Sequence, residues 1–214
     1  MRILCLSTLH PSAAAPNLGR FVQLSLDAAD ATGEAEIVRI CPVALPPWPL
    51  GELLPHYSAF AKLPRLDGAI LRPPYLRLPG LNPARDAAAV VTAVLPLARR
   101  LHAEKPFDMI DAQFFWPDGP AAMMIAEALG LPFSVKARGA DMHYWPTVKG
   151  CGALIREAAQ KANGLLAVSE AIKADVAALG ADPRKIMVTR TGMDRSLFVE
   201  ARVPGADFSQ RIDL

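Results

Sequence analysis

The chain has 214 residues, and its 52% hydrophobic and 21% charged content is enough to bury a sizeable core. A net charge of +2, from 23 basic and 21 acidic residues, gives no general case for nucleic-acid binding. The three cysteines, Cys5, Cys41 and Cys151, are widely separated, which is typical of reduced thiols in a cytosolic protein. The apolar stretch at the N-terminus is too short for a signal peptide, and no run of about 18 apolar residues could span a membrane. We therefore expect a cytoplasmic protein.

Strands and helices are predicted to alternate along almost the whole chain. Apolar runs and helical spacing indicate, in order, strand 2–8, helix 18–31, strand 35–41, strand 69–72, helix 84–103, strand 107–112, helix 118–129, strand 132–137, helix 152–162, strand 164–168, helix 169–179 and strand 185–189. Asp118 and Ser169 are suitable helix N-caps, and Gly130 and Gly180 follow helices as stops. This alternation predicts an α/β, Rossmann-like, mostly parallel sheet with helices on both faces.

The pattern breaks between residues 42 and 83, which hold ten of the 20 prolines. Because proline removes a backbone donor and fixes φ, we expect this insertion to be ordered by packing rather than by strand pairing, apart from 69–72. Within it, residues 56–82 interleave Lys62, Arg65, Arg72 and Arg77 with aromatic and leucine residues. Two interpretations stay open for this stretch: peripheral contact with anionic lipid headgroups, or an ordinary solvated loop.

Ligands of parallel α/β sheets bind where the strands end, so the residues that follow each strand are the candidate site. Gly19 and Arg20 open the first predicted helix, where a glycine lets backbone amides approach a diphosphate, although a simple turn needs a glycine as well. Gln113, Trp116 and Asp118 follow the strand at 107–112, within the run QFFWPDG. Because side chains alternate along a strand, at least one of its three consecutive aromatics should line the cleft.

The stretch ARGADMHYW after the strand at 132–137 is richer in functional groups than a plain turn requires. Arg138 offers a planar fork of donors for phosphate, and Asp141 can accept from a sugar hydroxyl. A surface ion pair between the two is the alternative, and it would contribute little. His143 follows them, and Ser169 and Gly192 follow the last two strands. We take Arg138 and Asp141 as candidate catalytic residues that act by electrostatic positioning, and the other three as residues of the cleft.

Several chemistries are disfavoured by missing motifs. The sequence has no G-x-G-x-x-G, no phosphate-binding G-x-x-x-x-G-K-[ST] and no G-x-S-x-G nucleophile turn. Its four histidines and three cysteines have no metal-ligand spacing. A dinucleotide-binding enzyme, a P-loop enzyme and an esterase-like hydrolase are therefore all disfavoured, and no metal is expected.

Two long stretches resemble a known family. AQFFWPDGPAAMMIAEALGLPFSVKARGAD and GLLAVSEAIKADVAALGADPRKIMVTRTGMDRSLF are similar, in content and in order, to the N-terminal domain of glycosyltransferase family four. The family comprises retaining enzymes with the GT-B fold, in which two Rossmann-like domains face each other across a cleft. The resemblance covers residues 1 to about 198, and it is weakest over 42–83. The most similar subgroup contains capsule, teichuronic-acid and exopolysaccharide glycosyltransferases.

The resemblance implies roles for matching positions. Gly19, with Arg20 beside it, would contact the donor diphosphate. Arg138 stands where the family usually carries a histidine near the transferred sugar, and Gln113 stands where the preceding strand often ends in a histidine. The segment 190–194, Arg-Thr-Gly-Met-Asp, replaces the usual Pro-Asn-Gly-Val-Asp. These departures weigh against a specific catalytic histidine.

The resemblance also implies a domain organisation. Residues 1–198 would form the acceptor-binding domain, and 199–214 the remnant of a linker to a C-terminal domain that binds the nucleotide sugar. The donor is then a substrate, no cofactor is needed, and the acceptor is a glycan or a lipid-linked sugar, with peripheral contact at the inner face of the membrane. Alone, the chain should be inactive. Two alternatives stay open: a stand-alone half-domain that binds a glycan or a catalytic partner subunit, and part of a nucleotide-sugar 2-epimerase.

Overall fold

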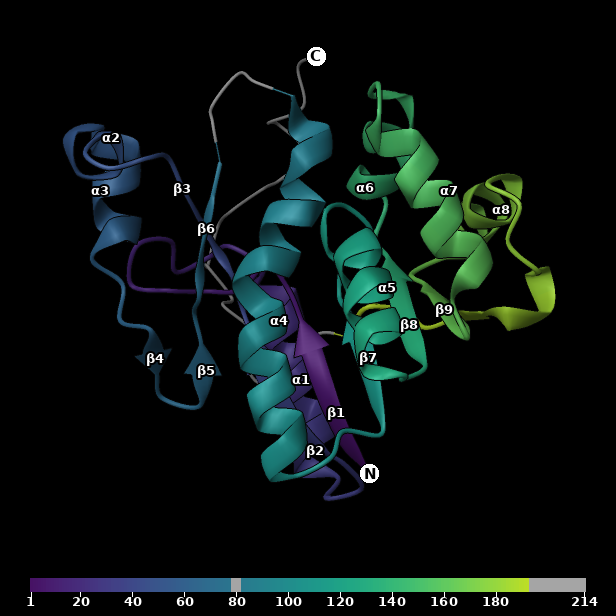
Figure 1. Cartoon of the computed structure of the whole chain (residues 1–214). Coiled ribbons are helices and arrows are strands. Elements are labelled where there is room, and N and C mark those ends of the chain that lie inside the picture. Colours follow the sequence, from purple (N-terminus) through teal and green to yellow (C-terminus); the bar gives the residue numbers. More distant parts are fainter. Residues whose placement is uncertain (78–81, 193–214) are drawn as a thin grey trace, which may run out of the picture.

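The computed structural model describes residues 1–77 and 82–192, and it has a central sheet with helices on both faces (Figure 1). The strand order is β10-β9-β8-β7-β1-β2-β5-β4, and all neighbouring strands are parallel except β4 and β5. The strands of this sheet are β1 (Arg2–Leu6), β2 (Glu36–Ile40), β4 (Leu66–Asp67), β5 (Ile70–Leu71), β7 (Met109–Ala112), β8 (Phe133–Ala137), β9 (Gly164–Ala167) and β10 (Ile186–Val188). The predicted α/β, Rossmann-like, mostly parallel sheet with helices on both faces is confirmed.

The helices connect successive strands over the faces of this sheet. They are α1 (Arg20–Ala31), α2 (Leu50–Leu53), α3 (Pro55–Ala61), α4 (Asp86–Glu104), α5 (Asp118–Leu129), α6 (Ala140–His143), α7 (Cys151–Lys161) and α8 (Glu170–Ala178). Helix α5 packs between α4 and α7, and α8 packs against β8, β9 and β10. Most of these helices and strands lie within two residues of their predicted bounds, because the apolar period and the flanking glycines were both readable in the sequence.

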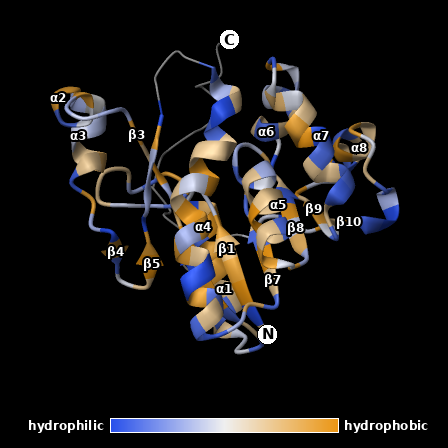
Figure 2. Cartoon of the chain, in the orientation of Figure 1, coloured by the Kyte–Doolittle hydropathy of each residue, from blue (hydrophilic) through white to orange (hydrophobic). Residues whose placement is uncertain are grey.

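The alternation of side chains along β1 explains why both faces of the sheet are covered. Leu4 and Leu6 are fully buried in the large core cluster that includes residues of α4, α5 and α7. Cys5 points to the other face, where it packs with Val22 and Leu26 of α1. A strand buried on both faces needs the continuous apolar run that the sequence has at this point. Figure 2 shows the same gathering of hydrophobic residues along the central strands.

The proline-rich segment differs from the prediction. Residues 43–76 contain strand pairing beyond the expected 69–72, because β3 (Val43–Leu45) pairs in parallel with β6 (Pro74–Leu76) and β4 pairs with β5. The prolines are compatible with these elements because they stand at their ends: Pro74 is the first residue of β6, and Pro55 is the first residue of α3. The expectation of packing without ladders was therefore wrong for this part of the chain.

The predicted helix caps have mixed outcomes. Ser169 caps α8, and its Oγ accepts a hydrogen bond from the amide of Ile172 at 3.2 Å. Asp118 does not cap α5: it is the first helical residue, after Pro117, and its carboxylate reaches across to another loop. The three cysteines are free and buried, as expected for reduced thiols.

Candidate active site at the carboxyl ends of the strands

Arg138 lies where the loops after β7 and β8 meet the start of α1. Its Nε donates to the carbonyl of Gln113 at 2.8 Å, and its Nη2 donates to Oε1 of the same residue at 2.6 Å. The guanidinium lies 4.7 Å from the ring centre of Phe21 on α1, which is a cation–π contact. Its remaining nitrogen, Nη1, is buried and has no hydrogen-bond partner among the described groups. Gln113 and Phe21 thus hold the guanidinium on two sides, while its Nη1 makes no hydrogen bond to a described group.

Asp141 organises the two loops that carry this arginine. Its side chain is fully buried, and Oδ1 accepts from the backbone amides of Arg138 and Gly139 at 2.9 and 2.8 Å. Oδ2 accepts from the amide of Phe115 at 2.8 Å. Burial raises the pKa of Asp141, although these amides favour its charged form. The alternative of a surface ion pair with Arg138 is not observed, because the backbone amide of Arg138, and not its guanidinium, bonds to the carboxylate.

Gly19 and Arg20 lie at the start of α1, as expected, but they have different surroundings. Gly19 is buried with φ of +67°, and a Cβ there would lie 2.5 Å from the backbone of Leu9. A glycine is therefore required by the close approach of the loop after β1, whatever it binds. Arg20 is exposed, and its Nη1 donates to Gln23 at 3.1 Å.

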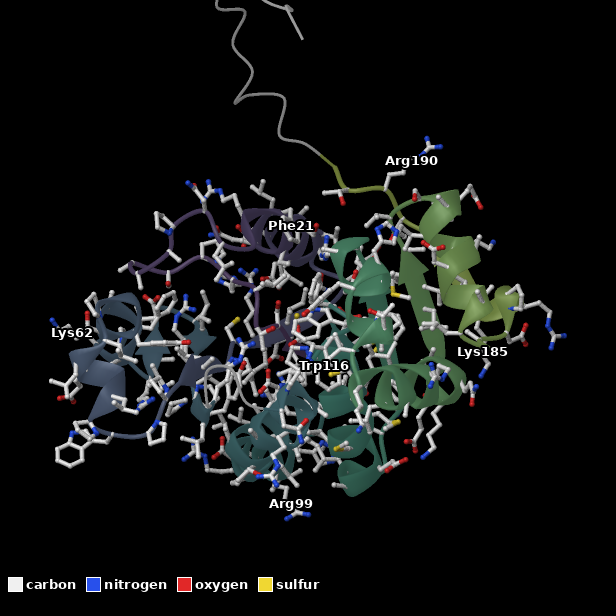
Figure 3. All side chains as sticks on the ribbon, turned by 90° about the horizontal axis from the view of Figure 1, so that it is seen from above. Phe21, Lys62, Arg99, Trp116, Lys185 and Arg190 are labelled. Atoms are coloured by element: carbon white, nitrogen blue, oxygen red, sulfur yellow. The ribbon has the colours of Figure 1, made fainter. Side chains whose placement is uncertain are left out.

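The residues after β7 line the centre of this edge of the sheet. Figure 3 looks down on the carboxyl ends of the strands, with Trp116 near the middle. Phe115 and Trp116 are buried, whereas Phe114 is partly exposed. Phe114 and Trp116 both border the cavity described below, so part of the aromatic run lines a hollow and not only the core. The ring of Trp116 lies 5.9 Å from that of Trp145.

Asp118 is buried beneath this edge. Both of its carboxylate oxygens accept from the amide of Thr8, at 3.2 and 3.0 Å, which joins the start of α5 to the loop after β1. Burial raises the pKa of Asp118 to about 7, and the nearby charge of Asp141 adds to the rise.

The remaining predicted residues are spread along the same edge but do not join the Arg138 cluster. His143 is exposed, and its Nε2 lies 3.3 Å from Asp175 of α8. Ser169 is engaged as a cap. Gly192 is exposed at the end of the described part, with open space around it. Met193, Asp194 and Phe198, and the proposed linker 199–214, lie outside the described residues.

Sequence reasoning missed a polar row on one face of β7 and β8. Asp111 accepts from Ser134 and from the side-chain amide of Gln113, and Lys136 is buried two residues further along β8. The period of two places all of them on the Arg138 side of the sheet. Burial raises the pKa of Asp111 and lowers that of Lys136. The available signal was a charged residue inside each predicted buried strand, which is rare without a partner.

A cavity of about 380 Å³ lies between the loop after β1 and the proline-rich segment. Its polar lining comprises Thr8, His10, Ser12, Arg72, Arg77 and Asp86. The carbonyl of Pro11 holds two of these residues: Arg72 Nη2 donates to it at 2.6 Å, and His10 Nδ1 lies 3.1 Å from it. Burial lowers the pKa of His10, which keeps the ring neutral. This site was not assigned from the sequence.

The basic residues of 56–82 are mostly not on a common surface. Arg72 is buried and pairs with Asp67 at 3.1 Å, and Arg77 pairs with Asp86 at 3.2 Å. Only Lys62 and Arg65 of the four are well exposed. Lys62 lies at the outer rim of the molecule, far from Trp116 (Figure 3). Across the described ranges, no helix combines the length and the apolar character needed to cross a bilayer.

A family comparison agrees with this geometry. The model of the glycosyl transferase 4-like domain matches residues 20–192, which is most of the chain. The chain belongs to the glycosyl transferase 4-like domain family. A curated relative, provisionally named as the teichuronic acid biosynthesis glycosyltransferase TuaC of Bacillus subtilis strain 168, is 27% identical over 179 residues. This glycosyltransferase 4-like domain aligns with it over 81% of its own length but only 45% of the relative.

Solved structures with the same fold include two instructive cases. HepE of Anabaena in complex with UDP has a TM-score of 0.54 at 16% identity, covering 92% of this domain and 46% of that chain. An enzyme of Listeria monocytogenes described as a UDP-N-acetylglucosamine 2-epimerase has a TM-score of 0.53 at 12% identity, covering 87% of this domain and 44% of that chain. At these identities the likeness concerns the fold alone, and in each case the domain matches less than half of the larger protein.

Proposed function

We propose that this domain is the acceptor-side half of a retaining glycosyltransferase, which moves a sugar from a nucleotide-sugar donor to a glycan or lipid-linked acceptor during cell-surface polysaccharide synthesis. Membership of the family and the relative named for teichuronic acid biosynthesis support sugar transfer. The UDP bound in HepE supports a nucleotide-sugar donor. No cofactor is required by this chemistry, since the nucleotide diphosphate itself is the leaving group.

The observation that carries the proposal is that Arg138 Nη1 has no hydrogen-bond partner among the described groups. Its guanidinium is fixed by Gln113 and Phe21, while Nη1 is buried without a partner. A buried N–H group without a hydrogen-bond partner is unfavourable. A phosphate oxygen of the nucleotide sugar would supply that partner. Negative charge grows on the diphosphate as its bond to the sugar breaks, so a preoriented arginine stabilises the transition state more than the ground state.

Other residues support this role without touching the reacting atoms. Asp141 positions Arg138 through the backbone of its loop, so a direct contact between its carboxylate and a sugar hydroxyl is not part of the proposal. Gly19 allows the loop after β1 to approach the start of α1, where backbone amides favour an anion. Arg20 is exposed beside it.

Transfer assays test the proposal. The product of the complete gene is incubated with a panel of UDP- and GDP-sugars and with membrane lipids of the source cell as acceptor. We expect Arg138→Gln to lower kcat about 100-fold or more, and Arg99→Gln, an exposed arginine of α4, to leave it unchanged. Full activity in Arg138→Gln would contradict the assigned role.

The domain by itself should not transfer sugar, because the donor-binding half is expected from a C-terminal domain. The sequence of the gene beyond the codon for Leu214 decides how this is tested. A reading frame that continues into a second Rossmann-like domain supports the two-domain enzyme. A stop codon there favours a half-domain with a separate catalytic partner, and appreciable transfer by residues 1–214 alone would refute the need for either.

We also propose peripheral membrane contact, through a surface that differs from the predicted one. Exposed apolar side chains occur on and next to α2, namely Trp48, Leu50, Leu53 and Leu54, and on the strands β4 and β6, namely Leu66 and Leu76. Lys62 and Arg65 are exposed cations in the connection between α3 and β4. Apolar side chains together with lysine and arginine suit an anionic leaflet, and they support the proposal of contact at the inner face of the membrane.

Vesicle sedimentation tests this contact. We expect the protein to sediment with phosphatidylglycerol vesicles and not with phosphatidylcholine vesicles, and to lose binding when Lys62 and Arg65 are both replaced by glutamate. The double variant Arg99→Glu and Arg100→Glu, at two exposed arginines of α4, is the matched control for the change of charge. Equal sedimentation of all variants, or none by the wild type, would refute the membrane proposal.

A further inference from the structure

A chain of hydrogen bonds leads from the interior of the sheet to the guanidinium of Arg138. Ser134 Oγ of β8 donates to Asp111 Oδ1 of β7 at 2.5 Å, and Asp111 Oδ2 accepts from the side-chain amide of Gln113. The side-chain oxygen of Gln113 then accepts from Arg138 Nη2 at 2.6 Å. All four residues are buried or partly buried, so these bonds hold their groups more firmly than bonds at an exposed surface would.

The sheet itself places the members of this chain. Strands β7 and β8 are parallel neighbours, and Asp111 is the register partner of Ser134. Gln113 follows Asp111 by two residues, so their side chains lie on the same face. The backbone amide of Gln113 donates to the carbonyl of Leu6 in β1 at 3.0 Å, which extends the strand pairing past the last residue of β7. The positions of Ser134, Asp111 and Gln113 are therefore set by strand register and not by a loop.

The side chain of Gln113 can satisfy both of its neighbours in one orientation only. Its oxygen accepts and its NH₂ group donates, whereas a carboxylate only accepts and a guanidinium only donates. If the amide were turned over, two donors would meet at Arg138 and two acceptors would meet at Asp111. The carboxylate of Asp111 therefore selects the orientation in which the oxygen of Gln113 faces Arg138.

The amide also separates the charge of Asp111 from that of Arg138. The guanidinium bonds to both oxygens of Gln113, and to no carboxylate of a described residue. A carboxylate in that place would form an ion pair with Arg138, and a diphosphate would have to compete with it. The hydrogen bonds of Asp111 go to Ser134 and Gln113 and not to the nearby cation of Lys136. The chain thus passes orientation to Arg138 without neutralising it.

We propose that Asp111 is a positioning residue, which orients the guanidinium of Arg138 through the amide of Gln113 and leaves its positive charge available to the donor diphosphate. The inference rests on the proposed function, because that function makes the diphosphate the partner of Arg138. Asp111 reaches the substrate only through two other side chains. Its replacement should therefore change the rate of transfer and not the choice of sugar.

Nitrogen-15 NMR of the 214-residue chain tests the hydrogen-bond chain without any transfer reaction. We expect separate Nη signals for Arg138 in the wild type, and averaged signals in Asp111→Leu, because Gln113 then loses the partner that fixes its amide. Asp108→Leu is the matched control, since Asp108 is an exposed aspartate just before β7 and does not belong to the chain of bonds. Unchanged Arg138 signals in folded Asp111→Leu would refute the positioning role.

Transfer by the product of the complete gene measures the consequence of this positioning. We expect Asp111→Leu to lower kcat about tenfold or more and to leave the KM for the donor nearly unchanged, because a misdirected arginine loses mainly transition-state stabilisation. Asp111→Asn keeps an oxygen that accepts from Gln113, while its NH₂ group can donate to Ser134 Oγ. It should therefore retain more activity than Asp111→Leu, and an equal loss in both variants would contradict positioning through this hydrogen bond.

A further pair of variants tests the separation of charge, and it decides the matter if Asp111→Leu does not fold. Asp111→Asn combined with Gln113→Glu keeps every bond of the chain but places a carboxylate directly on Arg138. Gln113→Glu alone brings two carboxylates together, so the double variant should be the more stable of the two in urea melts. We expect the double variant to raise the KM for the donor about tenfold or more, because the diphosphate must displace the new carboxylate. A wild-type KM, or a double variant no more stable than Gln113→Glu, would refute the inference.

The outcomes separate this inference from the proposed function. Arg138 signals that depend on Asp111 support the chain of bonds even if the gene product transfers no sugar, a result that would count against the proposed function. Transfer that is lost in Arg138→Gln but unchanged in folded Asp111→Leu would support the proposed function and refute the inference.

Discussion

Removing the carboxylate of Asp141 should destabilise the fold before it affects any chemistry. Three backbone amides, those of Phe115, Arg138 and Gly139, donate to this side chain, and they belong to two different loops. Asp141→Ala leaves all three without an acceptor in a fully buried place. Each buried amide that loses its partner costs about 1–3 kcal/mol.

The expected loss follows from these contacts. With three amides at the lower end of that range, Asp141→Ala should lower the free energy of unfolding by about 3 kcal/mol. We use the lower end because burial raises the pKa of Asp141, so the substitution also removes an unfavourable buried charge. Asp141→Asn should lose less, about 1–2 kcal/mol, because one oxygen still accepts while its NH₂ group faces the amide of Phe115.

Urea denaturation followed by circular dichroism measures the effect. Asp175→Ala is the matched control, since Asp175 is a partly exposed aspartate of α8 that contacts only His143 among the described polar groups. Surface substitutions of this kind change stability by about 0.5 kcal/mol or less. If Asp141→Ala were as stable as Asp175→Ala while transfer was abolished, the carboxylate would act in the reaction, and its positioning role would be refuted.

Two further predictions concern the loop after β1. We expect the stability of Asp118→Asn relative to the wild type to increase by up to about 4 kcal/mol between pH 4 and 8. The reason is that the pKa of Asp118 rises to about 7 on folding, so the wild type becomes less stable as the pH rises. Urea melts at several pH values test this, and a constant difference would contradict it. Gly19→Ala should lose about 3 kcal/mol, since its φ is positive and the new Cβ would meet the backbone of Leu9. Gly33→Ala, with the same φ and open space, should lose only about 1 kcal/mol in the same melts.

Most of the fold could be predicted because its signals are local. The helix at 118–129 has the predicted bounds, since an apolar run ends at Gly130, which adopts a left-handed conformation. The proline-rich segment could not be predicted in the same way. The pairing of β3 with β6 joins residues about 30 positions apart, and nothing in either short stretch indicates its partner.

The candidate site was predictable as a list of residues but not as a set of contacts. Strand ends identified Arg138 and Asp141, because the carboxyl ends of parallel strands share one edge. Their partners lie far away in sequence: Phe115 is 26 residues from Asp141, and Gln113 is 25 residues from Arg138. The amides of Arg138 and Gly139 that bond to Asp141 are local, but its bond to the amide of Phe115 cannot be read from the sequence.

The shared carbonyl of Pro11 has a consequence for how such domains can diversify. The loop after β1 and the proline-rich segment meet there, and the segment connects the sheet to α4 without contributing to the Arg138 cluster. Changes in the length or sequence of this segment would therefore reshape the cavity while the loops of β7 and β8 keep their geometry. The shape of this cavity can thus vary independently of the Arg138 cluster.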